Sequence, residues 1–244
     1  MSKRIPISII TGYLGAGKTT LLRKIIDQAK MRIAIVMNEF GEIAIDSEII
    51  KGKNVDMVEL AGGCVCCSLT GEFEAAIKEI VEKINPELIV VETTGVAEPD
   101  ALIINLDNIP DVRLDSIITI VDADSIVRFP EIGYTGRVQI EMGDIIIINK
   151  IDLVNEEQLK EVESLVRNIN DRAIIFKTFR CNLNIDVLFG LNFEKLAKRE
   201  IKFRRHIEEE NIQSFIFSTD KKLDKEKFEK LISSLPKEIY RSKG

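Results

Sequence analysis

The chain has 244 residues, of which 45% are hydrophobic and 30% are charged, and its formal net charge is −6. This length and composition suit one large α/β domain, or one domain with a small appendage. The negative charge gives no support for a nucleic-acid partner, and no apolar run is long enough to span a bilayer. Because the first residues lead straight into a predicted strand, they leave no room for a signal peptide, and we expect a cytoplasmic protein.

An apolar run from Ile5 to Ile10 is followed by a glycine-rich segment and then by apolar residues at helical spacing. This order predicts a buried strand, a loop and a helix. The loop has the pattern Gly-x-x-x-x-Gly-Lys-Thr of a P-loop, in which glycines let the backbone N–H groups surround phosphate oxygens. Lys18 is expected to reach the β- and γ-phosphates, and the Thr19 hydroxyl to bind Mg²⁺. The predicted nucleotide contacts of this segment are Gly12, Gly15, Ala16, Gly17, Lys18, Thr19 and Thr20.

A second buried strand is predicted from Pro86 to Glu92, where Leu-Ile-Val-Val precedes the final acid, and the chain continues into Thr-Thr-Gly95. An acid at the carboxyl end of a buried strand occupies the Walker B position, where it helps to hold Mg²⁺. Glu92 stands where Asp is commoner, and its longer side chain favours a contact through water. Gly95 is expected to donate its backbone N–H to the γ-phosphate.

The predicted strand that starts at Asp144 and continues through four isoleucines leads into Asn149-Lys150-Ile-Asp152. The carboxylate of Asp152 can accept hydrogen bonds from both N1–H and the exocyclic amine of guanine. Adenine lacks this pair of donors, so the motif predicts GTP as the nucleotide. Lys150 is expected to lay its stem along the base, and Asn149 to brace the loop.

Two further pairs of acids lie near predicted strand ends. Glu39 and Glu42 follow the predicted strand from Arg32 to Met37, where P-loop proteins place a switch loop that meets the γ-phosphate and Mg²⁺. Their carboxylates can bind a metal, order the attacking water, or do neither. Asp122 and Asp124 end the predicted strand that starts at Ser116, and we interpret them as helix caps rather than catalytic groups.

Three of the four cysteines lie together in Cys64-Val-Cys66-Cys67, directly after two glycines. In a reducing compartment such a cluster is more often a metal or redox site than a disulfide framework. Three thiolates suit Zn²⁺ and leave one position for a further ligand or for metal exchange. The alternative is three thiols that are only buried or redox-tuned. Cys181 stands alone in the loop after the last predicted strand.

The pattern predicts a doubly wound, mainly parallel P-loop sheet flanked by helices, with ligands at the carboxyl ends of the strands. We assign residues 1–191 to this domain, residues 192–211 to a charged linker, and residues 212–244 to a partial C-terminal domain of one strand and one helix. Further strands are predicted at 55–60 and 173–176, and helices at 69–83, 156–169 and 186–191.

The motifs at residues 12–20, 38–42, 62–67, 92–99 and 149–152 resemble those of the CobW-type metallochaperone GTPases. This family is related to the nitrile hydratase activators and to the nickel-insertion GTPases of hydrogenase and urease assembly. The resemblance spans about residues 5 to 190. It implies slow GTP hydrolysis with Mg²⁺, coupled to the binding of a transition metal, zinc or cobalt, and to its transfer to a client protein.

The resemblance also implies roles for single residues. Lys18, Thr19 and Glu92 would serve the phosphates and Mg²⁺, and Glu42 would position the attacking water. The transition-metal ligands would be Cys64, Cys66, Cys67 and Glu39. Family members often carry a His in the loop that holds Cys181 here, so this thiol is the first candidate for a soft replacement ligand. They also usually carry a larger C-terminal domain, which bears on client recognition.

Two other functions fit parts of the sequence. An assembly factor could use GTP to gate its hold on a client while its thiols bind only a structural zinc. A kinase or ATPase with a fortuitous Asn-Lys-x-Asp would bind ATP and GTP equally. Since no arginine finger is identifiable, hydrolysis is expected at about 10⁻³ s⁻¹ or slower, unless a partner or a homodimer promotes it.

Overall fold

The computed structural model describes residues 4–37, 55–59, 70–106 and 108–189. The strands are β1 (Ile5–Gly12), β2 (Ile33–Met37), β3 (Val55–Glu59), β4 (Leu88–Glu92), β5 (Val112–Asp122), β6 (Ile145–Asn149) and β7 (Ile174–Lys177). The α-helices are α1 (Lys18–Gln28), α3 (Thr70–Lys83), α4 (Asp100–Leu106), α5 (Ala123–Arg128), α6 (Tyr134–Met142) and α7 (Glu156–Ile169), with the 3₁₀ turns η2 (Ile151–Leu153) and η3 (Ile185–Leu188). The expected linker and partial C-terminal domain, and the domain boundary at 191, lie outside the described residues.

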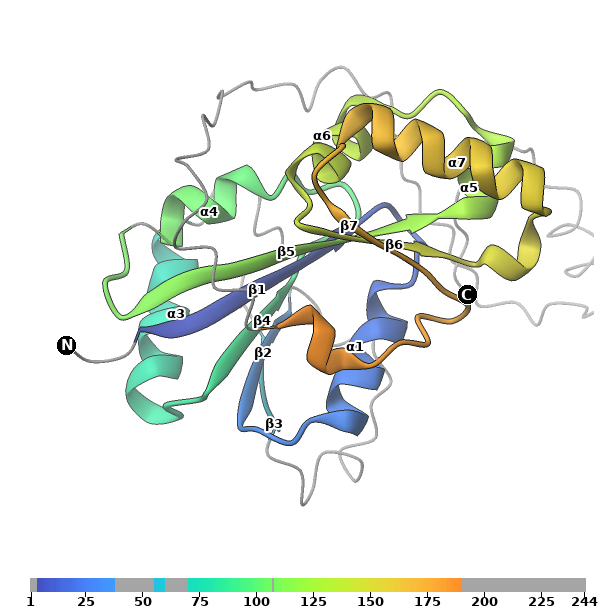
Figure 1. Cartoon of the computed structure of the whole chain (residues 1–244). Helices are drawn as coiled ribbons and strands as arrows, with labels where there is room; N and C mark the ends of the chain where they lie inside the picture. The colour runs from blue at the N-terminus through green and yellow to red at the C-terminus, as the bar shows by residue number, and fades with distance from the viewer. Residues whose placement is uncertain (1–3, 38–54, 60–69, 107, 190–244) are drawn as a thin grey trace, which may run out of the picture. The chain divides into compact units, whose positions relative to one another are not determined.

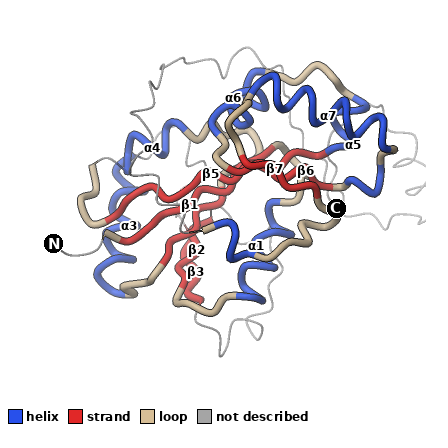
Figure 2. The backbone as a smooth tube through the Cα atoms, viewed as in Figure 1, coloured by secondary structure: helices blue, strands red, loops and turns tan. Residues whose placement is uncertain are grey.

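The strands of the described segments form one seven-stranded sheet in the order β3-β2-β4-β1-β5-β6-β7. Every neighbouring pair is parallel. The strands make a central layer with helices on both sides (Figures 1 and 2). This architecture confirms the predicted α/β P-loop fold. β1, which runs into the glycine loop, lies at the middle of the sheet between β4 and β5.

Alternation along the strands divides the core between the two faces of the sheet, because successive side chains of a strand point to opposite faces. Ile10, Ile145 and Ile147 pack in one cluster with apolar residues of α1 and η3. Ile9 belongs to a second cluster with α3 and α4, and Ile146 and Ile148 to a third with α5, α6 and α7. Both faces are therefore covered, as a parallel sheet requires.

Most predicted elements are present within one or two residues of their expected ends. The predicted helix at 156–169 matches α7, which starts with a capping box between Asn155 and Gln158. The helix expected at 186–191 is wrong in type, since the structure has the 3₁₀ turn η3 from Ile185 to Leu188. Asn184 caps this turn by accepting from the backbone N–H of Asp186. Ile185 and Leu188 are buried three residues apart, the spacing at which side chains align in a 3₁₀ turn.

The strand register gathers the polar ends of the strands at one edge of the sheet. Ile10, two residues before the glycine loop, pairs with Glu92 at the end of β4. Asp122 at the end of β5 pairs with Asn149 at the end of β6. The predicted ligand-binding edge therefore carries the residues expected there. None of the helices in the described segments has the length and apolar character needed to cross a membrane.

Candidate functional site

The glycine loop joins β1 to α1 at the carboxyl edge of the sheet. Gly12, Gly15 and Gly17 have φ of 140°, 77° and 120°, in a region that residues with a side chain rarely adopt. A Cβ on Gly12 would also collide with the carbonyl oxygen of Ile120 in β5. Glycine is therefore required where the chain leaves the strand, and the loop has the backbone shape of a phosphate cradle.

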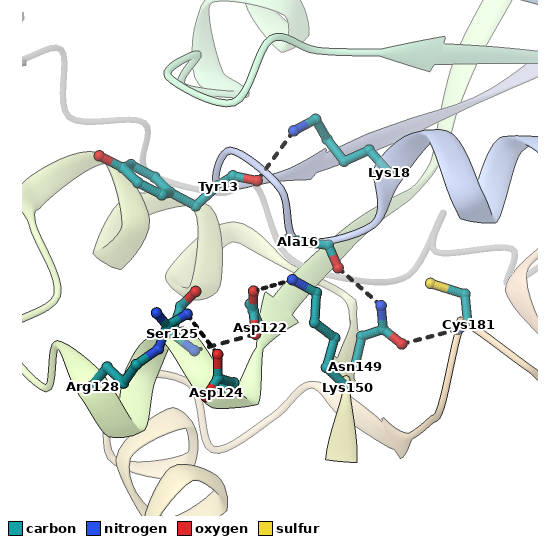
Figure 3. Close-up of polar contacts among 10 residues, drawn as sticks. All are labelled: Tyr13, Ala16, Lys18, Asp122, Asp124, Ser125, Arg128, Asn149, Lys150 and Cys181. Carbon is teal, nitrogen blue, oxygen red and sulfur yellow. Dashed lines mark hydrogen bonds and ion pairs between the residues drawn. The ribbon is translucent and has the colours of Figure 1, made fainter. Parts of the chain in front are cut away.

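Lys18 opens α1, and its side chain folds back over the loop (Figure 3). Its Nζ donates to the carbonyl oxygens of Gly12 at 2.8 Å and of Tyr13 at 3.3 Å. Thr19 and Thr20 follow in the first turn of the helix, where backbone N–H groups have no partner within the helix. The ammonium group and the positive helix end together make this loop a site for a polyanion.

Glu92 places a carboxylate beside the glycine loop. It ends β4 opposite Ile10 and is 9% exposed. The next residue, Thr93, donates its hydroxyl to the hydroxyl of Thr11 at 3.0 Å, which ties the strand ends together. The carboxylate of Glu92 and the hydroxyl of Thr19 are hard oxygen ligands of the kind that Mg²⁺ prefers. The donor set at this edge thus fits the predicted ion.

The turn after β4 packs directly against the glycine loop. A Cβ on Gly95 would lie 2.7 Å from the backbone nitrogen of Leu14, so a larger residue does not fit. From α6, the buried amide of Gln139 donates to the carbonyl oxygens of Ala97 at 2.9 Å and of Gly95 at 3.3 Å. Sequence reasoning missed Gln139, because nothing in its local pattern separates it from a surface glutamine.

Asn149 joins the predicted base-recognition motif to the glycine loop (Figure 3). Its Nδ2 donates to the carbonyl oxygen of Ala16 at 2.9 Å. Its Oδ1 accepts from the backbone N–H of Cys181 at 2.9 Å and from the hydroxyl of Thr178 at 3.2 Å. The side chain is buried, so three loops that are distant in sequence are held together by one amide. The contacts of Asn149 thus brace the loop, as expected from the sequence.

The turn after Asn149 carries the other two residues of the motif. Lys150 has the left-handed conformation, with φ 61° and ψ 34°, and η2 follows with Asp152 exposed. The Nζ of Lys150 contacts Oδ2 of Asp122 at 2.5 Å (Figure 3). Asp122 also caps α5, as expected, because its Oδ1 accepts from the N–H of Ser125 at 3.2 Å. Its second contact, with Lys150, was missed by sequence reasoning.

Cys181 is buried beside the glycine loop, with its Sγ 3.6 Å from the carbonyl oxygen of Gly17. Burial raises the pKa of the Cys181 thiol to about 12, against a smaller lowering effect of Lys24 and Lys150. Cys181 also packs in the core cluster that contains Ile185 and Leu188. Its candidacy as a replacement metal ligand stays a prediction.

The predicted transition-metal residues Glu39, Cys64, Cys66 and Cys67, and the predicted water-positioning residue Glu42, lie outside the described residues. Within residues 4–37, 55–59, 70–106 and 108–189, no group of three or more His, Cys, Asp or Glu side chains could hold a metal ion. The cysteine metal site stays a prediction.

Comparison with known proteins agrees with this geometry. The family model described as "CobW/HypB/UreG, nucleotide-binding domain" matches residues 6–177. The chain is 32% identical over 229 residues to a protein of Pseudomonas aeruginosa named "Zinc chaperone CobW", with 78% of this chain and 61% of the relative aligned. It is 29% identical over 246 residues to a protein of Escherichia coli named "Zinc chaperone YjiA", with 95% of this chain and 77% of the relative aligned.

The crystal structure of the Zn(II)-bound YjiA GTPase from E. coli is also similar. Its TM-score is 0.63 at 27% sequence identity, and the match covers 84% of this chain and 67% of that one. The alignment with the P. aeruginosa relative covers less than two thirds of that protein's length. The family model itself covers the nucleotide-binding domain, at residues 6–177.

Proposed function

The chain belongs to the CobW/HypB/UreG family, and on that premise we propose that it is a GTPase that binds zinc and transfers it to a client protein. The observation that carries the nucleotide part is the hydrogen bond from Asn149 to Ala16. It brings a phosphate-binding loop and an Asn-Lys-x-Asp motif into one site at the carboxyl edge of the sheet. This combination suits a guanine nucleotide.

In the proposed complex, the triphosphate lies over the glycine loop and the guanine base lies against the turn that holds Asp152. The N–H groups of the loop and the ammonium of Lys18 bind phosphate oxygens. The carboxylate of Asp152 accepts from N1–H and the 2-amino group of the base. Mg²⁺, held by Thr19 and Glu92, would supply charge neutralisation on the phosphates. Gly95 would donate its N–H to the γ-phosphate, and Glu42 would orient the attacking water.

The zinc part of the proposal rests on the cysteine motif and on the strand register. β2 and β3 are parallel, and Met37 pairs with Glu59 at their last residues. β2 and β3 therefore both end at the edge of the sheet that carries the glycine loop, shortly before the parts of the sequence that contain Glu39 and the three cysteines. We assign the zinc ligands to Cys64, Cys66, Cys67 and Glu39, a set of three thiolates and one carboxylate that suits Zn²⁺. The names of the relatives favour zinc over the cobalt alternative.

The partner in this proposal is a metal-requiring client protein, and the site of action is the cytoplasm, where a reducing environment keeps three adjacent thiols available for metal. A homodimer is a further proposal, since no arginine finger is recognised in the sequence and a second copy can supply one.

Two assays test the proposal. The first compares hydrolysis of GTP, ATP and XTP by the wild type and by Asp152→Asn. We expect turnover of GTP at about 10⁻³ s⁻¹ or slower, with ATP much slower still. We expect a shift towards XTP in the variant, because an amide donor pairs with the 2-oxo group of xanthine. Equal use of ATP and GTP by the wild type would contradict a GTPase, and turnover above about 1 s⁻¹ would contradict slow intrinsic hydrolysis.

The second assay follows the zinc. Protein loaded with one Zn²⁺ is mixed with a chromophoric chelator, with and without GTP. Release that depends on the nucleotide supports zinc transfer. Zinc that stays bound in both states supports the alternative, in which GTP gates the hold on a client and the metal is only structural.

A further inference from the structure

The pairing of β5 with β6 sets a carboxylate beside the base-recognition turn. Asp122 and Asn149 are register partners at the last residues of these two strands. Lys150 is the next residue after Asn149, and its Nζ lies 2.5 Å from Oδ2 of Asp122. The side chain of Asp122 is 6% exposed and that of Lys150 is 32% exposed. A pair that is this sheltered is screened by salt much less than an exposed surface pair.

The backbone at Lys150 needs such support. Its left-handed conformation, with φ 61° and ψ 34°, costs free energy for a residue with a Cβ and persists only when the surroundings fix it. Two backbone hydrogen bonds help, from Leu153 N–H to the carbonyl of Lys150 at 3.0 Å and from Ile151 N–H to the carbonyl of Thr178 at 3.3 Å. The ion pair with Asp122 is the side-chain anchor of the same turn.

Asp122 is itself well fixed. Its Oδ1 caps α5 by accepting from the N–H of Ser125, while Oδ2 holds Lys150. The following residue, Ala123, is fully buried in the core. The carboxylate is thus attached to a rigid part of the fold, and it can restrain the flexible lysine side chain.

We propose that Asp122 is a positioning residue for guanine recognition. By holding Lys150, it fixes the turn that presents the carboxylate of Asp152 to the base. It also keeps the lysine stem in a position where it can pack along the purine ring. This inference rests on the proposed function, since it takes a guanine nucleotide as the ligand. Asp122 acts through Lys150 and makes no contact with the base in this account.

The substitution Asp122→Asn removes the ion pair and keeps the helix cap. The amide oxygen of Asn still caps α5 by accepting from Ser125, because Asn is as good an N-cap as Asp. The charge that binds Lys150 is lost. Asp124→Asn is the matched control, since Asp124 lies two residues away and pairs with Arg128 at the exposed side of α5. Lys150→Gln is the complementary variant, because it keeps most of the stem and removes the ammonium.

The readout is the ratio of affinities for GDP and IDP, measured by calorimetry or by displacement of a fluorescent GDP analogue. IDP lacks the 2-amino group, so this ratio reports how well Asp152 is aligned. Loss of folded protein would lower the apparent affinity for both nucleotides equally and leave the ratio unchanged. We expect Asp122→Asn and Lys150→Gln each to lower the ratio about fivefold. The double variant should be no worse than either single variant, and Asp124→Asn should match the wild type.

The outcomes separate the two claims. A GDP-to-IDP ratio in Asp122→Asn equal to that of the wild type would overturn the inference, and so would additive effects in the double variant. If Asp122→Asn does not fold, an unchanged ratio in Lys150→Gln overturns the inference in its place. A wild type that binds ADP as tightly as GDP would overturn the proposed function, and the inference would fall with it.

Discussion

The side-chain amide of Asn149 donates to the carbonyl oxygen of Ala16 at 2.9 Å, across 133 positions of sequence. Its amide oxygen accepts from the N–H of Cys181, so the same side chain also holds the loop after β7. The glycine loop and the two loops that follow β6 and β7 are therefore parts of one unit. A nucleotide that touches both ends of this unit meets a preorganised site, which reduces the cost of ordering loops on binding.

Replacement of Asn149 by alanine should lower both the stability of the protein and its affinity for the nucleotide. The change removes both contacts to buried backbone groups, at Ala16 and at Cys181, and leaves those groups unsatisfied. We expect a loss of about 2–3 kcal/mol in the free energy of unfolding and a drop in GDP affinity of tenfold or more. Urea unfolding and a GDP titration measure the two effects.

Asn155 provides the matched control for Asn149. Its side-chain oxygen also accepts from a backbone N–H, that of Gln158, but it does so in the exposed capping box of α7. Asn155→Ala should cost about 1 kcal/mol of stability and leave GDP affinity unchanged. Equal losses of GDP affinity in the two variants would show that global stability, and not the bracing contact, governs binding.

Gly95→Ala should change the preference between triphosphate and diphosphate. Its Cβ would lie 2.6 Å from Cδ2 and 2.7 Å from the backbone nitrogen of Leu14, so the turn must move away from the glycine loop. We expect affinity for a non-hydrolysable GTP analogue to fall at least fivefold more than affinity for GDP, because the N–H of Gly95 is proposed to contact the γ-phosphate.

Gly71→Ala is the control for the glycine change. Gly71 lies in α3, and a Cβ there would meet no atom within 4 Å. The substitution should leave both nucleotide affinities unchanged and raise the free energy of unfolding by up to about 1 kcal/mol, since alanine favours helix. Parallel losses of GDP and GTP-analogue affinity in Gly95→Ala would remove the γ-phosphate role.

Cys181 should make the free energy of unfolding decrease as the pH rises into the alkaline range. Burial raises the pKa of its thiol from 9.0 to about 12. Between these values the folded state keeps a proton that the unfolded state has lost. The stabilising contribution of the thiol is thus fully present below pH 9 and is lost progressively as the pH rises from 9 towards 12.

Urea unfolding at pH 8 and pH 10 of the wild type and of Cys181→Ala checks this dependence. The variant removes this titration and leaves the other cysteines in place. The stability advantage of the wild type over the variant should therefore be smaller at pH 10 than at pH 8. An equal advantage at both values would mean that the buried thiol ionises normally.

The fold followed from the sequence because its signals were strong and local. Apolar runs such as Ile5 to Ile10 ended in residues of the predicted site. The spacing of the glycines after β1 matched that of a phosphate-binding loop. Two short helices, α4 and α6, were not predicted, since seven and nine residues give little periodicity. The helix expected at 186–191 is a 3₁₀ turn because Asn184 and the buried pair three residues apart favour the tighter winding.

The site was predictable where a motif fixed a residue's role and unpredictable where a role depended on register. The Asn-Lys-x-Asp motif pointed to Asn149 and Lys150, but the partner of Lys150 emerged only once β5 and β6 were paired through Asp122 and Asn149. Gln139 was missed for the same reason, since its contacts to Gly95 and Ala97 cross 44 and 42 residues of sequence. Such tertiary contacts leave no local pattern.

We further propose that the nucleotide state controls zinc binding. The most direct test is the Zn²⁺ affinity of the wild type and of Cys66→Ala, each with GDP and with a non-hydrolysable GTP analogue. The account predicts an affinity that changes with the nucleotide and collapses in the variant. It also predicts that Zn²⁺ changes the affinity for the GTP analogue relative to GDP by the same factor, because coupling is reciprocal. A Zn²⁺ affinity that is the same with both nucleotides would contradict the account.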